Sequence, residues 1–429
     1  MNYEEFFALA KKKKIDNIQI TEKTTISSSF ELINQELDSY DDSNNINYSI
    51  KAEKDGKTVK TQTEYLSEEI LDDLIINIEN TDSSYEDEYL KEKEQITKEE
   101  VPSFDISNEL KSLKECAKLR KKYSDIDKLT ISFSEDYINT RIINANSVDI
   151  STASHQCKLY VEAIARKDDQ YASFSNQLLE TDKNKFNFSQ FIEDALTKAT
   201  ILMNKEKLET KKYNLVLDSA IASCIISNLA TMVSAANIRE KTSCLEKKIN
   251  TKVFSEKLTI IEDPRDKKYP GYRLFDDEGT ETYKKNIVKN GIIETSISNI
   301  KEAKINKSIS TGNAYSGIGT RNMYIVPGEK TLEELLQELD NGIYITDYMG
   351  ASGTSISTVT GNISLQIFGF KIEDGKIVSG IEPCIMTTTI FELLSNIREV
   401  GSDLQFIMTS SASPSLLIDS ISIARWQVK

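Results

Sequence analysis

The sequence is short of histidine: its 429 residues include only His155. Histidine is the side chain that most often binds zinc or transfers protons near neutral pH. Hydrolytic zinc sites commonly use several imidazoles, and serine or cysteine triads need one beside the nucleophile. The scarcity of histidine therefore argues against a self-sufficient hydrolase.

The sequence also lacks a long apolar run. A membrane-spanning helix needs about 20 apolar residues, and no segment approaches that length. Near the N-terminus, Lys11 to Lys14 follow the apolar residues, which is the reverse of a secretory signal. The five cysteines are scattered and form no CxxC pair, which is typical of reduced thiols. We therefore expect a cytoplasmic protein with no membrane partner.

Clustered positive charge is missing as well. The chain has 53 lysine and arginine residues against 68 aspartate and glutamate residues, so its net charge is −15. Nucleic-acid binding depends on clustered cations that neutralise phosphates, and the longest basic run is Lys11 to Lys14. We therefore expect no nucleic-acid partner.

Apolar residues, by contrast, are numerous enough to support a buried core and are regularly spaced. They make up 39% of the chain, and segments with period-two alternation are interspersed with segments at helical spacing. This pattern predicts an α+β protein, and the length suggests two or three domains. We place an N-terminal α+β domain with an acidic connector at residues 1–100, a middle α+β domain at 101–210 and a β-rich C-terminal domain at 211–429.

The first two domains are expected to be α/β units with short mixed sheets and helices. Asp55-Gly56 predicts a hairpin turn, and Ser67 suits the N-cap of a helix. The stretch SYEDEYLKEKEQITKEE predicts an exposed acidic connector. Further helices are predicted near Ile106 to Tyr123 and from about Phe188 to Leu208.

The third domain is expected to be dominated by antiparallel β-strands around a buried helix. The helix is predicted from DSAIASCIISNLATMVSAANI, which is apolar on most sides. Thr331 and Glu334 form a capping-box pattern before LEELLQEL, and Asn290-Gly291 and Asp374-Gly375 predict hairpin turns.

Three constellations could carry chemistry. His155 and Cys157 would share one side of a strand, but the sequence supplies no obvious orienting group nearby, so we favour a structural role. Asp276, Asp277 and Glu278 could bind a hard cation, could orient a peptide amine, or could form a plain turn. The loop STGNAYSGIGT lacks the GK[ST] ending of a phosphate-binding loop, which leaves a flexible loop whose amides could pair with another chain.

Several segments, taken in order, are similar to the C-terminal half of the TldD/PmbA family. They are FDDEG at Phe275 to Gly279, STGNA at Ser310 to Ala314, NMYIVPGEKTLEELL, TDYMG at Thr346 to Gly350, VTGNISLQIFGFKIEDGKIV at Val359 to Val378 and SPSLLIDSISI at Ser413 to Ile423. Earlier segments, such as YNLVLD and INANSVDIS, also fall in the family's order, so the resemblance covers nearly the whole chain.

The resemblance implies a two-part peptidase. In it, a TldD-type subunit carries zinc on an HExxxH helix, and a TldE/PmbA-type subunit of the same fold completes a heterodimer. The HExxxH stretch corresponds here to residues 226–231, so Ile226, Ser227 and Thr231 stand in place of the two histidines and the glutamate. The late cysteine of the catalytic type is also absent between Asp403 and Pro414. The chain thus resembles the TldE/PmbA type.

We therefore expect a non-catalytic, metal-free subunit that pairs with a TldD-like zinc protease and helps to cut unfolded peptides or peptide leaders. Zinc is expected in the partner and no cofactor in this chain. The family motifs suggest peptide contacts at Asp276, Asp277, Glu278, Gly312, Asn313, Thr360, Gly361 and Asn362. An alternative, which includes a homodimeric form, is a stand-alone peptide-binding or regulatory protein. Independent hydrolysis through the acids at 276–278 ranks last.

Overall fold

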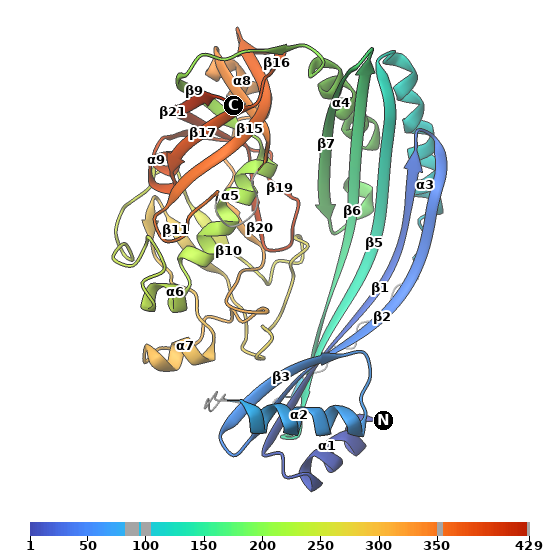
Figure 1. Ribbon diagram of the computed structural model, residues 1–429, viewed down its shortest axis with the longest axis vertical. Coiled ribbons are helices and arrows are strands. Elements are labelled where there is room, and N and C mark those ends of the chain that lie inside the picture. Colours follow the sequence, from blue (N-terminus) through green and yellow to red (C-terminus); the bar gives the residue numbers. More distant parts are fainter. Residues whose placement is uncertain (82–93, 96–103, 350–354, 427–429) are drawn as a thin grey trace.

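A computed structural model describes residues 1–81, 94–95, 104–349 and 355–426. The described residues form two β-sheets with helices around them. In Figure 1 the long strands of the N-terminal half stand beside the C-terminal half, and the N-terminal helices lie at one end of the molecule. The α+β class is thereby confirmed, while most of the predicted acidic connector falls outside the described residues.

The first sheet has 13 strands and draws on both halves of the chain. Its order is β12 (Ile292–Ile293), β11 (Lys285–Lys289), β10 (Ile260–Glu262), β13 (Met323–Ile325), β20 (Ser411–Ser413), β19 (Gln405–Phe406), β7 (Gln170–Glu180), β6 (Asp149–Lys167), β5 (Ile126–Asn144), β1 (Asn17–Ile33), β2 (Glu36–Lys54) and β3 (Lys57–Thr63), with β4 (Glu94–Gln95) beside β6.

The prediction of short mixed sheets in the N-terminal half is wrong. β1 has 17 residues, β2, β5 and β6 have 19 each, and all neighbours from β7 to β3 pair antiparallel. Apolar residues mark the ends of β1, but its middle, near TEKTT, is polar and only partly buried. Backbone pairing with β2 and β5 carries the strand across this polar stretch, which hydrophobic periodicity does not detect.

Helices cover the two ends of the long sheet. They are α1 (Tyr3–Lys12), α2 (Glu68–Asn80), α3 (Ser107–Cys116) with the short helix η1 (Ala117–Lys122), η2 (Lys183–Lys185) and α4 (Phe188–Ile201). Ser67 caps α2 through a bond from Ile70 N, as predicted. The helix predicted to continue to Leu208 ends at Ile201, and residues Lys205–Glu206 form β8 of the second sheet.

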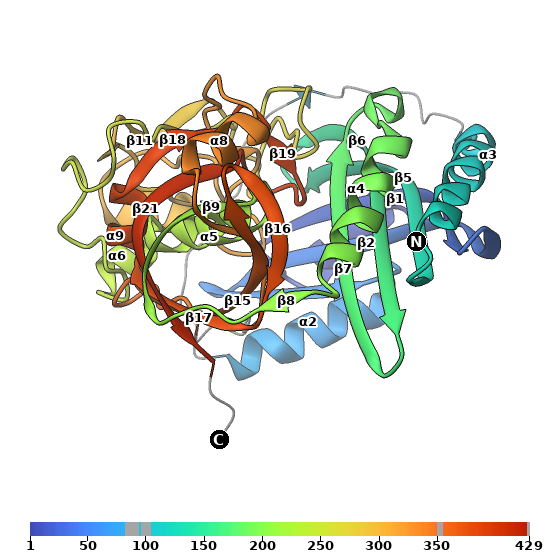
Figure 2. The same ribbon diagram turned by 90° about the horizontal axis from the view of Figure 1, so that it is seen from above.

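The second sheet contains a closed five-stranded barrel. β14 (Gly342–Met349), β9 (Lys211–Leu217), β21 (Leu416–Arg425), β17 (Cys384–Thr389) and β15 (Asn362–Glu373) pair in that order, and β14 also pairs with β15. Figure 2 looks into this ring from above. β16 (Lys376–Ile381), β8 and β18 (Ile397–Val400) extend it. Closure leaves the five ring strands without an open edge.

The buried helix predicted for the C-terminal half is α5 (Ser219–Met232). Asp218 caps it, and its apolar side chains pack with strands of both sheets in one core. The shorter helices are α6 (Ala235–Arg239), α7 (Ile300–Ile305), α8 (Leu332–Leu339) and α9 (Ile390–Ser395). The capping box of Thr331 and Glu334 at α8 is confirmed.

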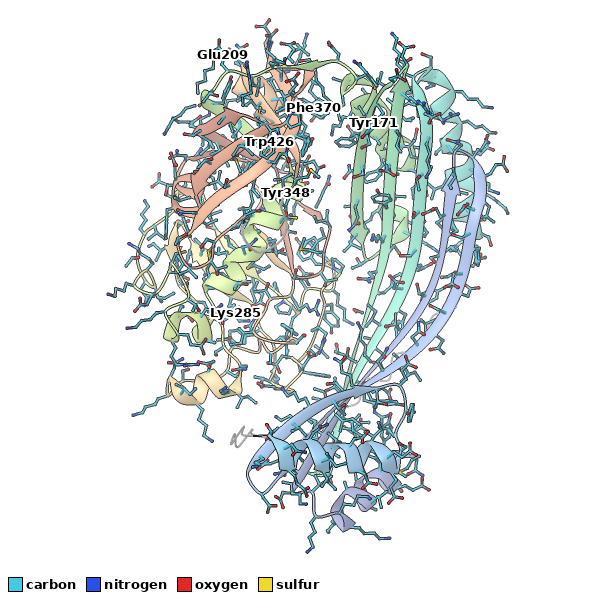
Figure 3. The ribbon with its side chains drawn as sticks, viewed as in Figure 1. Tyr171, Glu209, Lys285, Tyr348, Phe370 and Trp426 are labelled. Atoms are coloured by element: carbon cyan, nitrogen blue, oxygen red, sulfur yellow. The ribbon has the colours of Figure 1, made fainter. Side chains whose placement is uncertain are left out.

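The barrel packs against the long sheet through an apolar contact. Phe370 of β15 lies 6.3 Å from Phe174 of β7 between ring centres, and Figure 3 shows Phe370 on the side of the barrel that faces these strands. Tyr344 and Leu417 belong to the same buried cluster. One sheet thus runs through all three predicted domains, whose boundaries stay a prediction. No helix among the described residues is both long and apolar enough to cross a bilayer.

Candidate functional site

Helix α5 occupies the place where the family resemblance puts the zinc motif. Ile226 is fully buried, and the Ser227 hydroxyl donates to Cys224 O at 2.7 Å within the helix. Thr231 is exposed in the last turn. Zinc binds through imidazole, thiolate or carboxylate ligands, and these three positions offer none of them. The helix therefore does not fit a zinc ion and serves as a core element.

The acidic trio forms a turn between β10 and β11. Asp276 is completely buried and accepts hydrogen bonds from the backbone N–H groups of Glu278, Thr280 and Ala314 at 2.9 to 3.0 Å. Burial raises the pKa of Asp276 to about 7, against the lowering effect of these bonds. The hydrogen bonds of its carboxyl group therefore hold the turn against the loop that contains Ala314.

The other two acids point to different partners. Asp277 accepts from Arg273 Nη2 at 2.9 Å and from Ser316 N at 3.2 Å. Glu278 accepts from Ile300 N at 2.9 Å, at the start of α7. The three carboxylates therefore do not converge on one point, which disfavours the alternative of a common cation site.

The glycine-bearing loop at 310–319 lies directly against this turn. Gly312 has φ of +70°, and a Cβ there would lie 2.6 Å from Glu281 O, so only glycine fits without strain. Asn313 is buried and donates to Glu262 Oε1 at 2.8 Å and to Gly319 O at 2.7 Å. These contacts fix the position of Asn313 within the loop, while the predicted flexibility of the loop stays a prediction.

A buried ion pair anchors the loop. Lys285 Nζ lies 2.9 Å from Glu262 Oε2, and the two side chains are 4% and 0% exposed. Glu262 also accepts from Arg321 N at 2.9 Å. Figure 3 shows Lys285 within the C-terminal half, well away from Phe370 on the barrel. The sequence motifs did not point to Glu262, because its partners come from three separate segments.

Thr360, Gly361 and Asn362 lie elsewhere, at the start of β15 in the barrel sheet. Gly361 has φ of +75° and accepts from Ile390 N at 2.7 Å, while Thr360 N donates to Ser357 Oγ at 3.2 Å. The turn at 276–278 belongs to the first sheet. The structure therefore brings Asp276, Asp277, Glu278, Gly312 and Asn313 together but places the other three candidates in a separate group.

His155 does have an orienting group, contrary to the sequence interpretation. Its Nε2 lies 2.9 Å from Glu135 Oε1 on the neighbouring strand β5, and its Nδ1 lies 3.0 Å from Thr181 O. The hydrogen bond to Glu135 raises the pKa of His155. Glu135 lies 20 residues before His155 on the adjacent strand, and strand register, which the sequence motifs do not specify, pairs Glu135 with Cys157.

Glu135, His155 and Cys157 have ligand-type atoms within 4.8 Å of one another. Two features disfavour a metal ion there. Lys183 Nζ already lies 3.1 Å from Glu135 Oε2 and would repel a cation. Burial raises the pKa of the Cys157 thiol to about 12, so it is protonated at neutral pH. We interpret the group as a partly buried ion-pair cluster.

A continuous groove separates the long sheet from the loops of the C-terminal half. Two cavities of about 630 and 720 Å³ share the lining residues Thr21, Ser49, Gln62, Asp277 and Ser316. One wall is the polar middle of β1, β2, β3, β5 and β6, and the other carries Arg273, Asp277 and Arg321. The groove is lined both by residues of the candidate turn and loop, Asp277 and Ser316, and by residues of the N-terminal half.

The comparisons with known proteins assign the fold and the family. Residues 210–425 match the family model described as the PmbA/TldA metallopeptidase C-terminal domain. A crystal structure of a Thermotoga maritima protein, described as a candidate modulator of a DNA gyrase, superposes with a TM-score of 0.86 at 27% identity, covering 99% of this chain and 100% of that one. The chain belongs to the PmbA/TldD family.

Two further proteins are similar to this chain, one in fold and one in sequence. TldE from Thermococcus kodakarensis has the same fold, with a TM-score of 0.83 at 20% identity over 98% of this chain and 99% of that one. A metalloprotease PmbA homolog from Buchnera aphidicola is 31% identical over 47% of this chain and 44% of its own length. The chain spans about half the length of the curated relatives it matches.

Proposed function

We propose that this chain is a non-catalytic, metal-free subunit of TldE/PmbA type, which pairs with a TldD-like zinc protease to cut unfolded peptides or peptide leaders. The observation that carries the proposal is helix α5, where Ile226, Ser227 and Thr231 offer no zinc ligand in a family of metallopeptidases. Zinc, the activated water and the catalytic glutamate would then belong to the partner.

Co-expression with a TldD-like protein that carries HExxxH tests this function. The pure chain, supplied with zinc, should not cleave a fluorogenic unfolded peptide, whereas the complex should. Replacing the glutamate of the partner's motif with glutamine should abolish cleavage while the complex remains intact on size exclusion. Zinc-dependent cleavage by the pure chain would contradict the proposal.

A second candidate is a stand-alone peptide-binding or regulatory protein. The groove favours it, because both walls come from this one chain and need no partner. The Thermotoga relative is described as a candidate gyrase modulator, and this description supports a regulatory role. A homodimer in solution that binds peptides, and gains no cleavage from any HExxxH protein, would favour this candidate over the first.

A further inference from the structure

The groove combines one regular wall and one charged wall. On the sheet side, Thr21 pairs with Ser49 across β1 and β2, and Lys23 pairs with Thr140 across β1 and β5. Residues two apart on a strand point to the same face, so these side chains form a single polar surface. Hydroxyl and amide groups of this kind can hydrogen-bond a peptide backbone.

The lining is basic although the chain is acidic. Among the described residues, the two connected cavities are lined by the cations Lys23, Lys51, Lys60, Arg273 and Arg321 and by the anions Asp277 and Glu278. With five cations and two anions, the lining carries a net positive charge, whereas the whole chain has a net charge of −15. A local excess of one sign attracts a ligand of the other.

Arg321 is the cation best placed to receive an anion. Its Nη1 donates to the neutral hydroxyl of Thr409 at 2.5 Å, and its buried Nε has no hydrogen-bond partner among the described residues. The carboxylate of nearby Glu262 is paired with Lys285. A desolvated guanidinium without a paired carboxylate is costly, and an incoming carboxylate would relieve that cost.

Arg273 adds a second positive charge beside Arg321. Both guanidinium groups lie over the ring of Tyr315, with Arg273 Cζ at 5.6 Å and Arg321 Cζ at 5.1 Å from its centre. Asp277 bonds to Arg273 and not to Arg321 in the described residues. Burial lowers the pKa of Arg321, and the charge of Arg273 lowers it further. Of these two guanidinium groups, only Arg273 forms an ion pair with a carboxylate among the described residues.

We infer that this groove binds an extended peptide through a carboxylate held by Arg321, with Arg273 beside it and the polar sheet face along the peptide backbone. The carboxylate could be an acidic side chain or the C-terminus of the peptide, because arginine binds both with the same forked geometry. The inference rests on the peptide-handling role proposed above and names the class of peptide, but it concerns binding by this chain alone.

Fluorescence anisotropy with the full chain and three labelled peptides tests the inference. The first is an amidated, glutamate-containing decapeptide, the second replaces each glutamate with glutamine, and the third is the glutamine peptide with a free C-terminus. We expect the first or the third to bind at least about ten-fold more tightly than the second, since a charge-assisted hydrogen bond contributes that much. Which of the two binds identifies the source of the carboxylate.

Variants locate the site. Arg321→Gln should remove the preference for the carboxylate peptide, and Arg321→Lys, which keeps the charge without the fork, should reduce it. The matched control is Arg166→Gln, which makes the same charge change at an exposed position of the β6–β7 hairpin and should leave binding unchanged. Thermal unfolding of each variant checks that the fold is retained.

Three results would overturn the inference. They are equal binding of all three peptides, equal loss of binding in R321Q and R166Q, and equal or tighter binding of a single-stranded oligonucleotide of the same length. None of these depends on cleavage by a partner, so failure here and failure of the proposed protease complex can be told apart.

Discussion

Lys285 and Glu262 form a buried ion pair, Nζ to Oε2 at 2.9 Å, at the base of the loop that carries Asn313. Removing one partner leaves the other charge buried without compensation. Lys285→Met should therefore lower the free energy of unfolding by about 3 to 5 kcal/mol, measured by urea denaturation.

The double variant with Glu262→Gln should recover part of that loss, since glutamine keeps an oxygen that can accept from Arg321 N. Lys252→Met is the control, because its ion pair with Glu256 is solvent-exposed and contributes roughly 0.5 kcal/mol or less. Equal losses in Lys285→Met and Lys252→Met would contradict the buried-pair interpretation.

The His155–Glu135 contact should make stability depend on pH. The hydrogen bond raises the pKa of His155 above 6.5, so its contribution is present at pH 5.5 and is lost as the pH rises through the folded-state pKa. Burial raises the pKa of Glu135, but the bonds from His155 and Lys183 lower it overall, so Glu135 stays ionised at pH 5.5. His155→Gln should cost about 1 kcal/mol at pH 5.5 and less at pH 9. An equal cost at both pH values would exclude a charged imidazole.

Cys157 should be chemically inert in the native protein. Its side chain is fully buried, and burial raises its pKa to about 12. At pH 8 iodoacetamide should therefore not modify Cys157 until the chain is unfolded, as peptide mass spectrometry would show. Partly exposed Cys116 is the internal comparison and should react first. Rapid native modification of Cys157 would show that the cluster opens.

Asp276 should make the protein less stable as the pH rises. Its pKa is about 7 when folded and near 3.8 otherwise, so the folded state binds more protons between these values. Compared with Asp276→Asn, the wild type should lose roughly 1 to 3 kcal/mol of stability between pH 5 and pH 8. Chemical denaturation across this range measures the difference, and parallel curves would show that Asp276 keeps its charge throughout.

Gly312 and Gly56 form a matched pair for the loop. Both have positive φ, +70° and +74°, but a Cβ at Gly312 meets Glu281 O at 2.6 Å whereas one at Gly56 meets nothing within 4 Å. Gly56→Ala should cost about 1 kcal/mol from backbone strain alone. Gly312→Ala should cost roughly 1 to 3 kcal/mol more in thermal unfolding, since backbone must shift. Similar losses of stability at the two positions would mean that the backbone of the loop shifts at little energetic cost.

Local signals in the sequence predicted local structure well. The cap at Ser67, the capping box at Thr331 and the hairpin turns at Asp55-Gly56 and Asn290-Gly291 depend only on neighbouring residues, and the structure contains each of them. The segment TRIINANSVDI contains no Asn-Gly or Asp-Gly pair, yet Ser147 turns the chain there with φ of +63° between β5 and β6. The sequence gives little indication that this serine adopts a positive φ.

The sequence by itself determined the α+β class, the buried helix α5 and the absence of zinc ligands at Ile226, Ser227 and Thr231, because residue type and spacing decide these. Only the tertiary structure decided the length of β1, the contact of Glu135 with His155 and the groove lined by Arg321. Each of these depends on backbone pairing or side-chain contact between different strands or loops, for which no local pattern exists.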